Sequence, residues 1–301
     1  MGTDAPNLTA VTPYPLTFAP VVLEKVWGGR RLARLGKALA RPTGGYGESW
    51  EIADLGATSE SGAGGGAVRS VVDAGELAGR VIGDALGAAG VGGGGPSPFP
   101  LLIKYLDAAA NLSVQVHPSP AAARADVRAH LKTESWYVVE AEAGASLYIG
   151  LKEGVTRERF ERALRTGGSD QVVELLERID AVPGRCHTLP SGIVHALGAG
   201  VLVAEVQTPS DTTFRVYDWG RTGRELHVDA AMECISFGPA RDATRLAETA
   251  STARLVSTGF FLVDEMRVGS TAVALGTACA TDEAPMTDQH AVAIIVIGGA
   301  I

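Results

Sequence analysis

The sequence has little cysteine and no long apolar run, and both absences narrow the classes of protein it can belong to. Its 301 residues include only Cys186, Cys234 and Cys279, with no CxxC pair. A disulfide framework is therefore not expected, which suits a reducing compartment. The longest apolar run, residues 291–301, is about half the length that spans a bilayer, so we expect no membrane partner.

Targeting signals and basic blocks are also missing. The first residues, MGTDAPNLTAVTPYP, lack a basic segment followed by an apolar one, which predicts no signal peptide and a cytoplasmic location. Pro6 stands where N-myristoylation needs Ser or Thr. The formal net charge is −8 and Lys and Arg do not cluster, so nucleic acid is not expected as a partner.

Glycine is abundant, but not in a pattern that binds nucleotides. The clusters at 62–66 and 92–95 lack the GxxxxGK[ST] pattern and are expected to be surface loops. Neither a βαβ rhythm nor a solenoid repeat is present. Short strands with glycine turns between them predict a mainly β protein, a barrel or sandwich. We expect a turn at Trp27–Gly29 and strands over 16–23, 48–53, 99–106, 111–117, 136–140, 145–149, 202–207 and from 187 onward.

Helical patterns are few. Helices are predicted over 30–39, 75–89, 156–164 and 170–179, the first helix of the last pair being capped by Thr156. This last pair forms a small helical insertion near 156–180. After Met232 the pattern is all-β, with strands expected over 253–256, 260–268, 271–275 and 291–297.

Two histidines and a carboxylate have the composition of a metal site. In the strand 111–117 the odd positions place Gln115 and His117 on one face, opposite an apolar face. Glu134 begins a later strand, and His195 precedes another. Two imidazoles and one carboxylate are usual protein ligands of a catalytic zinc with one open position, although iron uses similar sets. We expect His130, His187, His227 and His290 not to be ligands.

Seven segments carry a resemblance to a known family. They are VWGG at 26–29, ESWEIAD at 48–54, PFPLLIKYLDA at 98–108, NLSVQVHPS at 111–119, KTESWYVVEAEAGASLYIGLKEGV at 132–155, PSGIVHALGAGVLVAEVQTPSDTTFRVYDWGR at 190–221 and LVSTGFFLVDE at 255–265. In this order and spacing they resemble the type I mannose-6-phosphate isomerases, in their short bacterial form. The resemblance extends over residues 15–301.

The resemblance implies a cupin fold. Residues 15–232 would form a metal-binding cupin-type β-barrel that contains the helical insertion. Residues 233–301 would form a second, smaller cupin-like β unit, truncated at its C-terminus because relatives usually continue beyond GGAI. Residues 1–14 would be disordered.

The resemblance also implies an activity, the interconversion of mannose 6-phosphate and fructose 6-phosphate with one Zn²⁺ per chain. A phosphorylated hexose is then the partner, and we expect a monomer or homodimer. By matching positions, the metal ligands are Gln115, His117, Glu134 and His195. Arg215, Lys132 and Asp211 are candidate catalytic residues. Lys104, Lys132 and Glu205 are candidate substrate-binding residues. Leu131 stands where some longer relatives have a histidine, so a proton-transfer role for that histidine does not carry over.

Aldose–ketose isomerisation moves a proton between C1 and C2 and needs stabilisation of an enediol(ate). Asp211, Glu205 and a metal-bound water are all candidates for the proton carrier. Two other functions stay open, an iron-dependent cupin oxygenase and a catalytically inactive sugar-binding cupin. The pairing of KTE with SDTTFR favours an anionic sugar over an oxidative cosubstrate.

Overall fold

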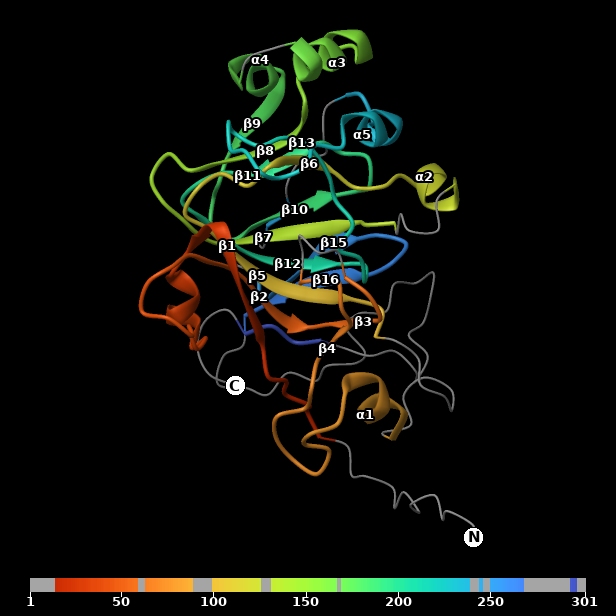
Figure 1. Ribbon diagram of the computed structural model, residues 1–301. Helices are drawn as coiled ribbons and strands as arrows, with labels where there is room; N and C mark the ends of the chain where they lie inside the picture. The colour runs from red at the N-terminus through yellow and green to blue at the C-terminus, as the bar shows by residue number, and fades with distance from the viewer. Residues whose placement is uncertain are drawn as a thin grey trace.

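Two antiparallel sheets form the centre of the computed structural model, which describes residues 14–58, 63–88, 99–125, 131–166, 169–238, 244–245, 250–267 and 293–296. The larger sheet has seven strands, in the order β1 (Val21–Gly29), β2 (Tyr46–Ile52), β5 (Leu102–Ala108), β12 (Val201–Gln207), β7 (Glu134–Ala141), β10 (Arg185–Leu189) and β14 (Thr244–Arg245). The smaller has five, in the order β13 (Phe214–Tyr217), β6 (Val114–Val116), β11 (His195–Leu197), β8 (Ser146–Leu151) and β9 (Leu176–Asp180). Figure 1 shows the two sheets stacked one above the other.

The remaining elements cover the outer faces of this stack. The helices between residues 157 and 234 lie above the smaller sheet, and a hairpin packs on the larger (Figure 1). The helical elements are η1 (Arg31–Leu35), α1 (Ile82–Ala88), α2 (Pro120–Ala125), α3 (Arg157–Thr166), α4 (Ser169–Glu174) and α5 (Val228–Cys234). The two-stranded sheets pair β3 (Asp54–Leu55) with β4 (Val68–Arg69), and β15 (Thr252–Ser257) with β16 (Leu262–Met266). No helix in the described part of the chain is long and apolar enough to cross a membrane.

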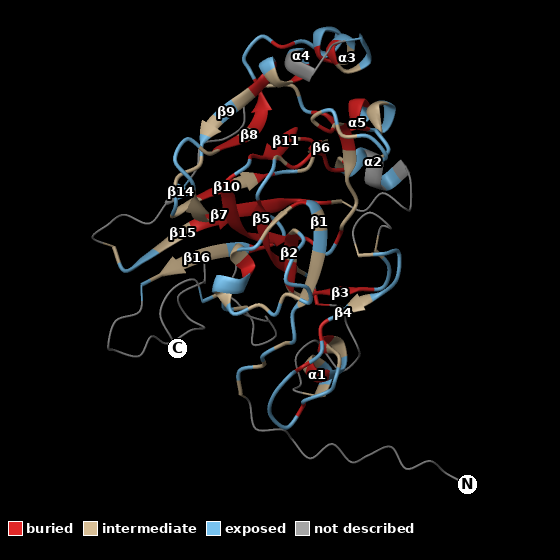
Figure 2. Cartoon of the chain, turned by 60° about the vertical axis from the view of Figure 1, so that its left-hand side comes forward, coloured by how far each residue is buried: buried red, intermediate tan, exposed pale blue. Residues whose placement is uncertain are grey.

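Strand alternation decides which side chains face the space between the sheets. Val203 of β12 and Val138 of β7 share a core cluster with Leu147 of the opposite sheet. Their neighbour Leu202 packs on the outer face, around η1. The central strands are buried on both faces, as Figure 2 shows in red. Because side chains alternate with a period of two, Lys104 and Glu205 lie on the inner face with the core.

One arginine fastens the edge strand β1 to this sheet. Arg31 donates from Nε to Oδ1 of Asp107 at 2.7 Å and from Nη1 to the carbonyl of Gly200 at 2.9 Å. Its Nη2 donates to the carbonyl of Val201 at 3.0 Å. Asp107 is completely buried and also accepts the backbone N–H of Arg31 at 2.6 Å. A buried ion pair is tolerated when its hydrogen-bonding capacity is used in this way.

The mainly β class and most of the predicted strands are confirmed. The turn expected at Trp27–Gly29 is wrong, because these residues end β1 beside a register shift. Gly28 has no side chain and so allows the backbone of β1 to lie close to that of β2. The helix expected over 75–89 begins only at Ile82, since Gly75 and Gly79 have φ of 83° and 85°.

The predicted helical insertion also differs from the structure. The second helix of the insertion ends at Glu174, and residues 176–180 form β9, whose Ile179 pairs with Leu147 of β8. Leu176 and Ile179 are three residues apart and could lie on one face of a helix. In the structure this segment instead pairs with β8 at the edge of the smaller sheet. The helix α5 was not predicted at all. Residues 293–296 are not in a strand, whereas 271–275 and most of 1–14 lie outside the described residues. The division at residue 232 stays a prediction.

Gly28 generates a test of this packing. A Cβ on Gly28 would stand 2.5 Å from the carbonyl carbon of Tyr46 on β2, so Gly28→Ala forces two backbones apart. We expect it to lower the free energy of unfolding by about 1–3 kcal/mol, measured by urea denaturation. The control is Gly56→Ala, whose Cβ would meet open space and which should change stability by less than about 0.5 kcal/mol. Equal stability of the two variants would contradict the close-approach account.

Candidate functional site

The predicted ligands His117, Glu134 and His195 come together at one end of the space between the sheets. Glu134 begins β7, His195 begins β11, and His117 directly follows β6. All three side chains are buried, and their ligand atoms lie within 4.8 Å of one another. Gly192, with φ of 89°, makes the tight turn from β10 toward His195 and donates its N–H to the carbonyl of His117 at 3.2 Å.

The hydrogen bonds of the two imidazoles fix their tautomers. Nδ1 of His117 lies 3.1 Å from the carbonyl oxygen of Thr212, and Nδ1 of His195 lies 2.8 Å from that of Ile193. A carbonyl can only accept, so each Nδ1 carries the proton and each Nε2 keeps a lone pair. Such bonds are the usual outer support of metal-binding histidines.

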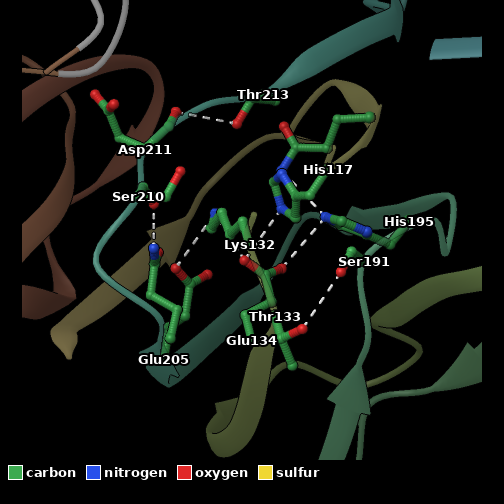
Figure 3. A network of polar contacts seen from close by, with 12 residues as sticks. His117, Lys132, Thr133, Glu134, Ser191, His195, Glu205, Ser210, Asp211 and Thr213 are labelled. Atoms are coloured by element: carbon green, nitrogen blue, oxygen red, sulfur yellow. Dashed lines mark hydrogen bonds and ion pairs between the residues drawn. The ribbon is translucent and has the colours of Figure 1, made fainter. Parts of the chain in front are cut away.

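Both lone pairs face the carboxylate of Glu134. Nε2 of His117 is 3.2 Å from Oε2, and Nε2 of His195 is 3.3 Å from Oε1 (Figure 3). Burial lowers the pKa of His117 to about 3 and also lowers that of His195, so both are neutral at pH 7. Burial alone would raise the pKa of Glu134, but the ammonium group of Lys132 holds it well below its usual range. These contacts therefore bring acceptor against acceptor.

A cation resolves that conflict. Nε2 of His117 and Oε1 of Glu134 are buried and have no donor among the described residues. A divalent metal between the three groups would accept all of these lone pairs. The separations of 3.2 and 3.3 Å are close to the roughly 3.4 Å between ligands in a tetrahedral zinc site. The donor set and the orphaned atoms thus fit a metal ion.

Gln115 lies beside this trio. Its Nε2 is 3.2 Å from Nε2 of His195, and its Oε1 is 3.4 Å from the hydroxyl of Ser113. A half-turn of the amide exchanges oxygen and nitrogen and would present Oε1 to the centre. The predicted polar face of residues 113–117 is confirmed, since Val114 and Val116 pack on the helical side.

A row of alternating charges leads from the trio across the large sheet. It consists of Glu134, Lys132, Glu205, Lys104, Glu48 and Lys25, which we call the charge row. Successive nitrogen–oxygen distances along it are 2.7, 3.9, 3.0, 3.8 and 3.3 Å. None of these side chains is more than 12% exposed. Burial would lower the pKa of Lys104, yet Glu205 and Glu48 raise it. With three carboxylates and three ammonium groups, the charge row has no formal net charge.

The charge row forms one wall of a cleft of about 690 Å³, counted with its open mouth. The opposite side carries Arg215 of β13 and Arg224 of the following loop. Arg215 pairs in register with Gln115, and its Nη1 donates to the carbonyl of Glu225 at 2.9 Å. Burial and then Arg224 lower the pKa of Arg215. The cleft is lined by charged side chains (Lys25, Glu48, Lys104, Lys132, Glu205, Asp211, Arg215, Arg224) and by aromatic ones (Trp27, Trp50, Trp136).

The structure thus brings most of the predicted site residues into one cleft. Asp211 also lines it, but its carboxylate points away from Glu134 (Figure 3). His187 is buried in β10 and is not part of the metal-capable cluster found among the described residues, while His130 and His290 lie outside those residues. Sequence reasoning missed Lys25, Glu48 and Arg224. Glu48 could have been found from the alternation Glu48–Trp50, whereas Arg224 stands in a loop with no periodic signal.

The comparisons with known proteins agree with one another. The family described as phosphomannose isomerase type I, catalytic domain, matches residues 16–152. The probable mannose-6-phosphate isomerase GmuF of Bacillus subtilis is 38% identical over 74% of this chain and 69% of its own length. Mannose-6-phosphate isomerase of Streptococcus mutans is 34% identical, covering 84% and 79% respectively.

Solved structures extend the match to the fold. The mannose 6-phosphate isomerase of Bacillus subtilis superposes with a TM-score of 0.69 at 30% identity, over 85% of this chain and 80% of that one. A mannose 6-phosphate isomerase bound with zinc and yttrium shares the fold at 17% identity, with a TM-score of 0.59 over 83% and 82% of the two chains. The cupin fold and the family resemblance are confirmed, and the chain belongs to the type I phosphomannose isomerase family.

Proposed function

We propose that this protein is a metal-dependent mannose-6-phosphate isomerase, which interconverts mannose 6-phosphate and fructose 6-phosphate through an enediol(ate). One observation carries the proposal. The buried Nε2 of His117 and Oε1 of Glu134 have no donor among the described residues and converge with Nε2 of His195, next to a cleft whose far side is cationic. A metal there and a phosphosugar in the cleft would satisfy both features, and the family's activity supplies the substrate.

The metal we propose is one Zn²⁺ per chain, held by His117, Glu134 and His195 with Gln115 as the fourth ligand. Neutral imidazoles and a carboxylate suit zinc. When bound, zinc supplies positive charge next to the sugar oxygens at C1 and C2, where the enediolate charge develops. Lys132, 2.7 Å from Oε2 of Glu134, keeps that carboxylate ionised and oriented.

Two buried histidines give a matched test of the metal centre. His117→Ala should lose the metal, because a site with two imidazoles does not retain zinc at normal affinity without one of them. His187→Ala removes an equally buried imidazole from β10 and should keep the metal. The metal content of the two variants is measured by inductively coupled plasma mass spectrometry, and circular dichroism verifies that each variant is folded. Zinc retained in His117→Ala, or lost from folded His187→Ala, would refute the ligand assignment.

Glu205 is better placed than Asp211 to carry the proton between C1 and C2. Its Oε2 accepts the indole N–H of Trp136 at 2.7 Å, which fixes the carboxylate on the cleft floor. Its Oε1 lies between the ammonium groups of Lys104 and Lys132, at 3.0 and 3.9 Å. A carboxylate held in this way can accept a proton without reorienting. Asp211 reaches the cleft from a loop, with its carboxylate pointing away from Glu134 (Figure 3).

The two ends of the cleft differ in charge, and this difference supports one position for the phosphate. Lys104 and Lys132 already face carboxylates, and the charge row is neutral as a whole. At the other end Arg215 and Arg224 line the cleft, and Arg224 shares the buried carboxylate of Asp218 with Arg221 behind it. Three guanidinium groups there lie near one carboxylate, which leaves an excess of positive charge. We infer that the phosphate dianion binds at the arginine end and that the lysines donate to the sugar oxygens.

Arg215 lies between the metal centre and the phosphate end. Its strand pairs with β6 at Gln115, and its Nε is buried with no hydrogen-bond partner among the described residues. An unpaired guanidinium N–H in a dry site is a preorganised donor for developing negative charge. We therefore assign Arg215 to stabilising the enediolate.

Kinetics of three variants test these roles. Glu205→Gln and Arg215→Ala should each lower kcat, the second by about 100-fold, as loss of one preorganised donor does. Asp211→Asn should stay within a few-fold of the wild type, roughly the size of a surface change. Steady-state rates with mannose 6-phosphate measure all three. A raised KM with unchanged kcat in Arg215→Ala would show that Arg215 only anchors substrate.

A coupled assay of the purified protein tests the function itself. Fructose 6-phosphate should form from mannose 6-phosphate, disappear after chelation and return with zinc, because the metal supplies the charge stabilisation. Unphosphorylated mannose is the control and should react far more slowly. A zinc-loaded, folded protein that binds mannose 6-phosphate without turnover would instead support a catalytically inactive sugar-binding cupin, and activity only with iron and O₂ would support an oxygenase.

A further inference from the structure

The loop after β13 holds two arginines on one buried carboxylate. Asp218 is 2% exposed at its side chain and accepts from Nη2 of Arg221 at 2.7 Å. Its other oxygen accepts from Nε of Arg224 at 2.8 Å, and Nη2 of Arg224 also contacts the first oxygen. Arg224 is therefore bound by one edge of its guanidinium, and its Nη1 has no partner among the described residues. Arg221 does not line the cleft, whereas Arg224 does.

The backbone of this loop is strained at Trp219, and the strained turn brings Arg221 close to Asp218. Trp219 has φ of 54°, the left-handed region, and is alone among described non-glycine residues in having positive φ. Its ring packs 5.5 Å from the rings of Tyr148 and Tyr217, and its indole N–H donates to the carbonyl of Leu112. The turn that results brings the N–H of Arg221 to the carbonyl of Asp218 at 3.0 Å. Strain that packing retains next to a cleft is a sign of a functional constraint.

Arg221 also binds the loop to the segment before β6, the strand that carries Gln115. Nη2 of Arg221 donates to the carbonyl of Asn111 at 2.8 Å, just before β6. On the other side, the carbonyl of Glu225, next to Arg224, accepts from Arg215. The position of Arg224 is thus defined relative to both β6 and Arg215 before any substrate binds.

From these contacts we propose that Asp218 is a positioning residue, which acts through Arg224 to preform the phosphate-binding end of the cleft. The substrate named here rests on the function proposed above. Asp218 binds one edge of Arg224 and directs the other edge toward the cleft, as Glu225 does for Arg215. Preorganisation of this kind raises affinity because the arginine loses its rotamer freedom on folding and not on binding.

An electrostatic role and a positioning role of Asp218 predict opposite changes in phosphate affinity, so one substitution distinguishes the two roles. Asp218→Asn removes a negative charge near the phosphate, so a purely electrostatic role predicts tighter binding of anions. A positioning role predicts weaker binding, because the two-point hold on Arg224 is lost. We expect the dissociation constant for inorganic phosphate, measured by calorimetry on the zinc-loaded protein, to rise about tenfold. The KM for mannose 6-phosphate should rise in parallel, with kcat within about threefold.

Coupling to Arg224 is the second readout. In an Arg224→Ala background, Asp218→Asn should cause no further loss of phosphate affinity, since Asp218 acts through that side chain. Arg224→Lys, at a side chain 25% exposed, keeps the charge but cannot make the two-point contact, and should also bind phosphate more weakly. It remains informative if Asp218→Asn fails to fold.

The matched control is Asp54→Asn. Asp54 is also buried, 3.5 Å from Nε of Arg69, and accepts the N–H of Phe99 at 2.9 Å, away from the cleft. Its variant should keep wild-type phosphate affinity and kinetics. Unchanged or tighter phosphate binding in Asp218→Asn, additive losses in the double variant, or wild-type affinity in Arg224→Lys would each overturn the proposal. Phosphate binding needs no turnover, so an inactive wild type with the expected pattern would contradict the isomerase assignment and not this inference.

Discussion

The cleft depends on the burial of one ionised carboxylate, that of Glu134. A carboxylate in so dry a place would ordinarily become protonated. Here the adjacent ammonium of Lys132 keeps it ionised, and the neutral histidines require a cation to complete the centre. Lys132 in turn needs Glu205, and the alternation continues to the edge strand. In the charge row, buried charges of opposite sign therefore compensate one another from the metal-capable cluster to the edge strand.

The charge row also makes the arrangement of the cleft depend on the register of the large sheet. Its members come from neighbouring strands in register, with Glu205 opposite Lys104 on β5 and opposite Trp136 on β7. A slip of one residue in any pairing would turn a charged side chain into the outer core. The requirement for ion pairing and the requirement for apolar burial therefore select the same register. Arg31 and Asp107 secure this register where β1 joins.

The strands and the metal-capable residues could be predicted from the sequence, whereas contacts between distant segments could not. The period-two alternation at Gln115 and His117 predicted one polar face, and the residue types of Glu134 and His195 predicted a metal centre before any contact was known. Alternation is a local property, so sequence carries it. The contacts of Arg224 with Asp218 and of Lys25 with Glu48 depend on how distant strands and loops meet. Local preference also failed at residues 176–179, where pairing with β8 overrides a helix-compatible pattern.

The strand order has a consequence for how the chain acquires its structure during synthesis. β12, residues 201–207, lies between β5 and β7, both of which leave the ribosome long before it. Until β12 emerges, Lys104 lacks Glu205, and the edges of β5 and β7 are unpaired. Such non-local sheets form slowly and expose edges that can join other chains. We therefore expect nascent chains that end before residue 201 to need a chaperone, and the cleft to form only in the last third of translation.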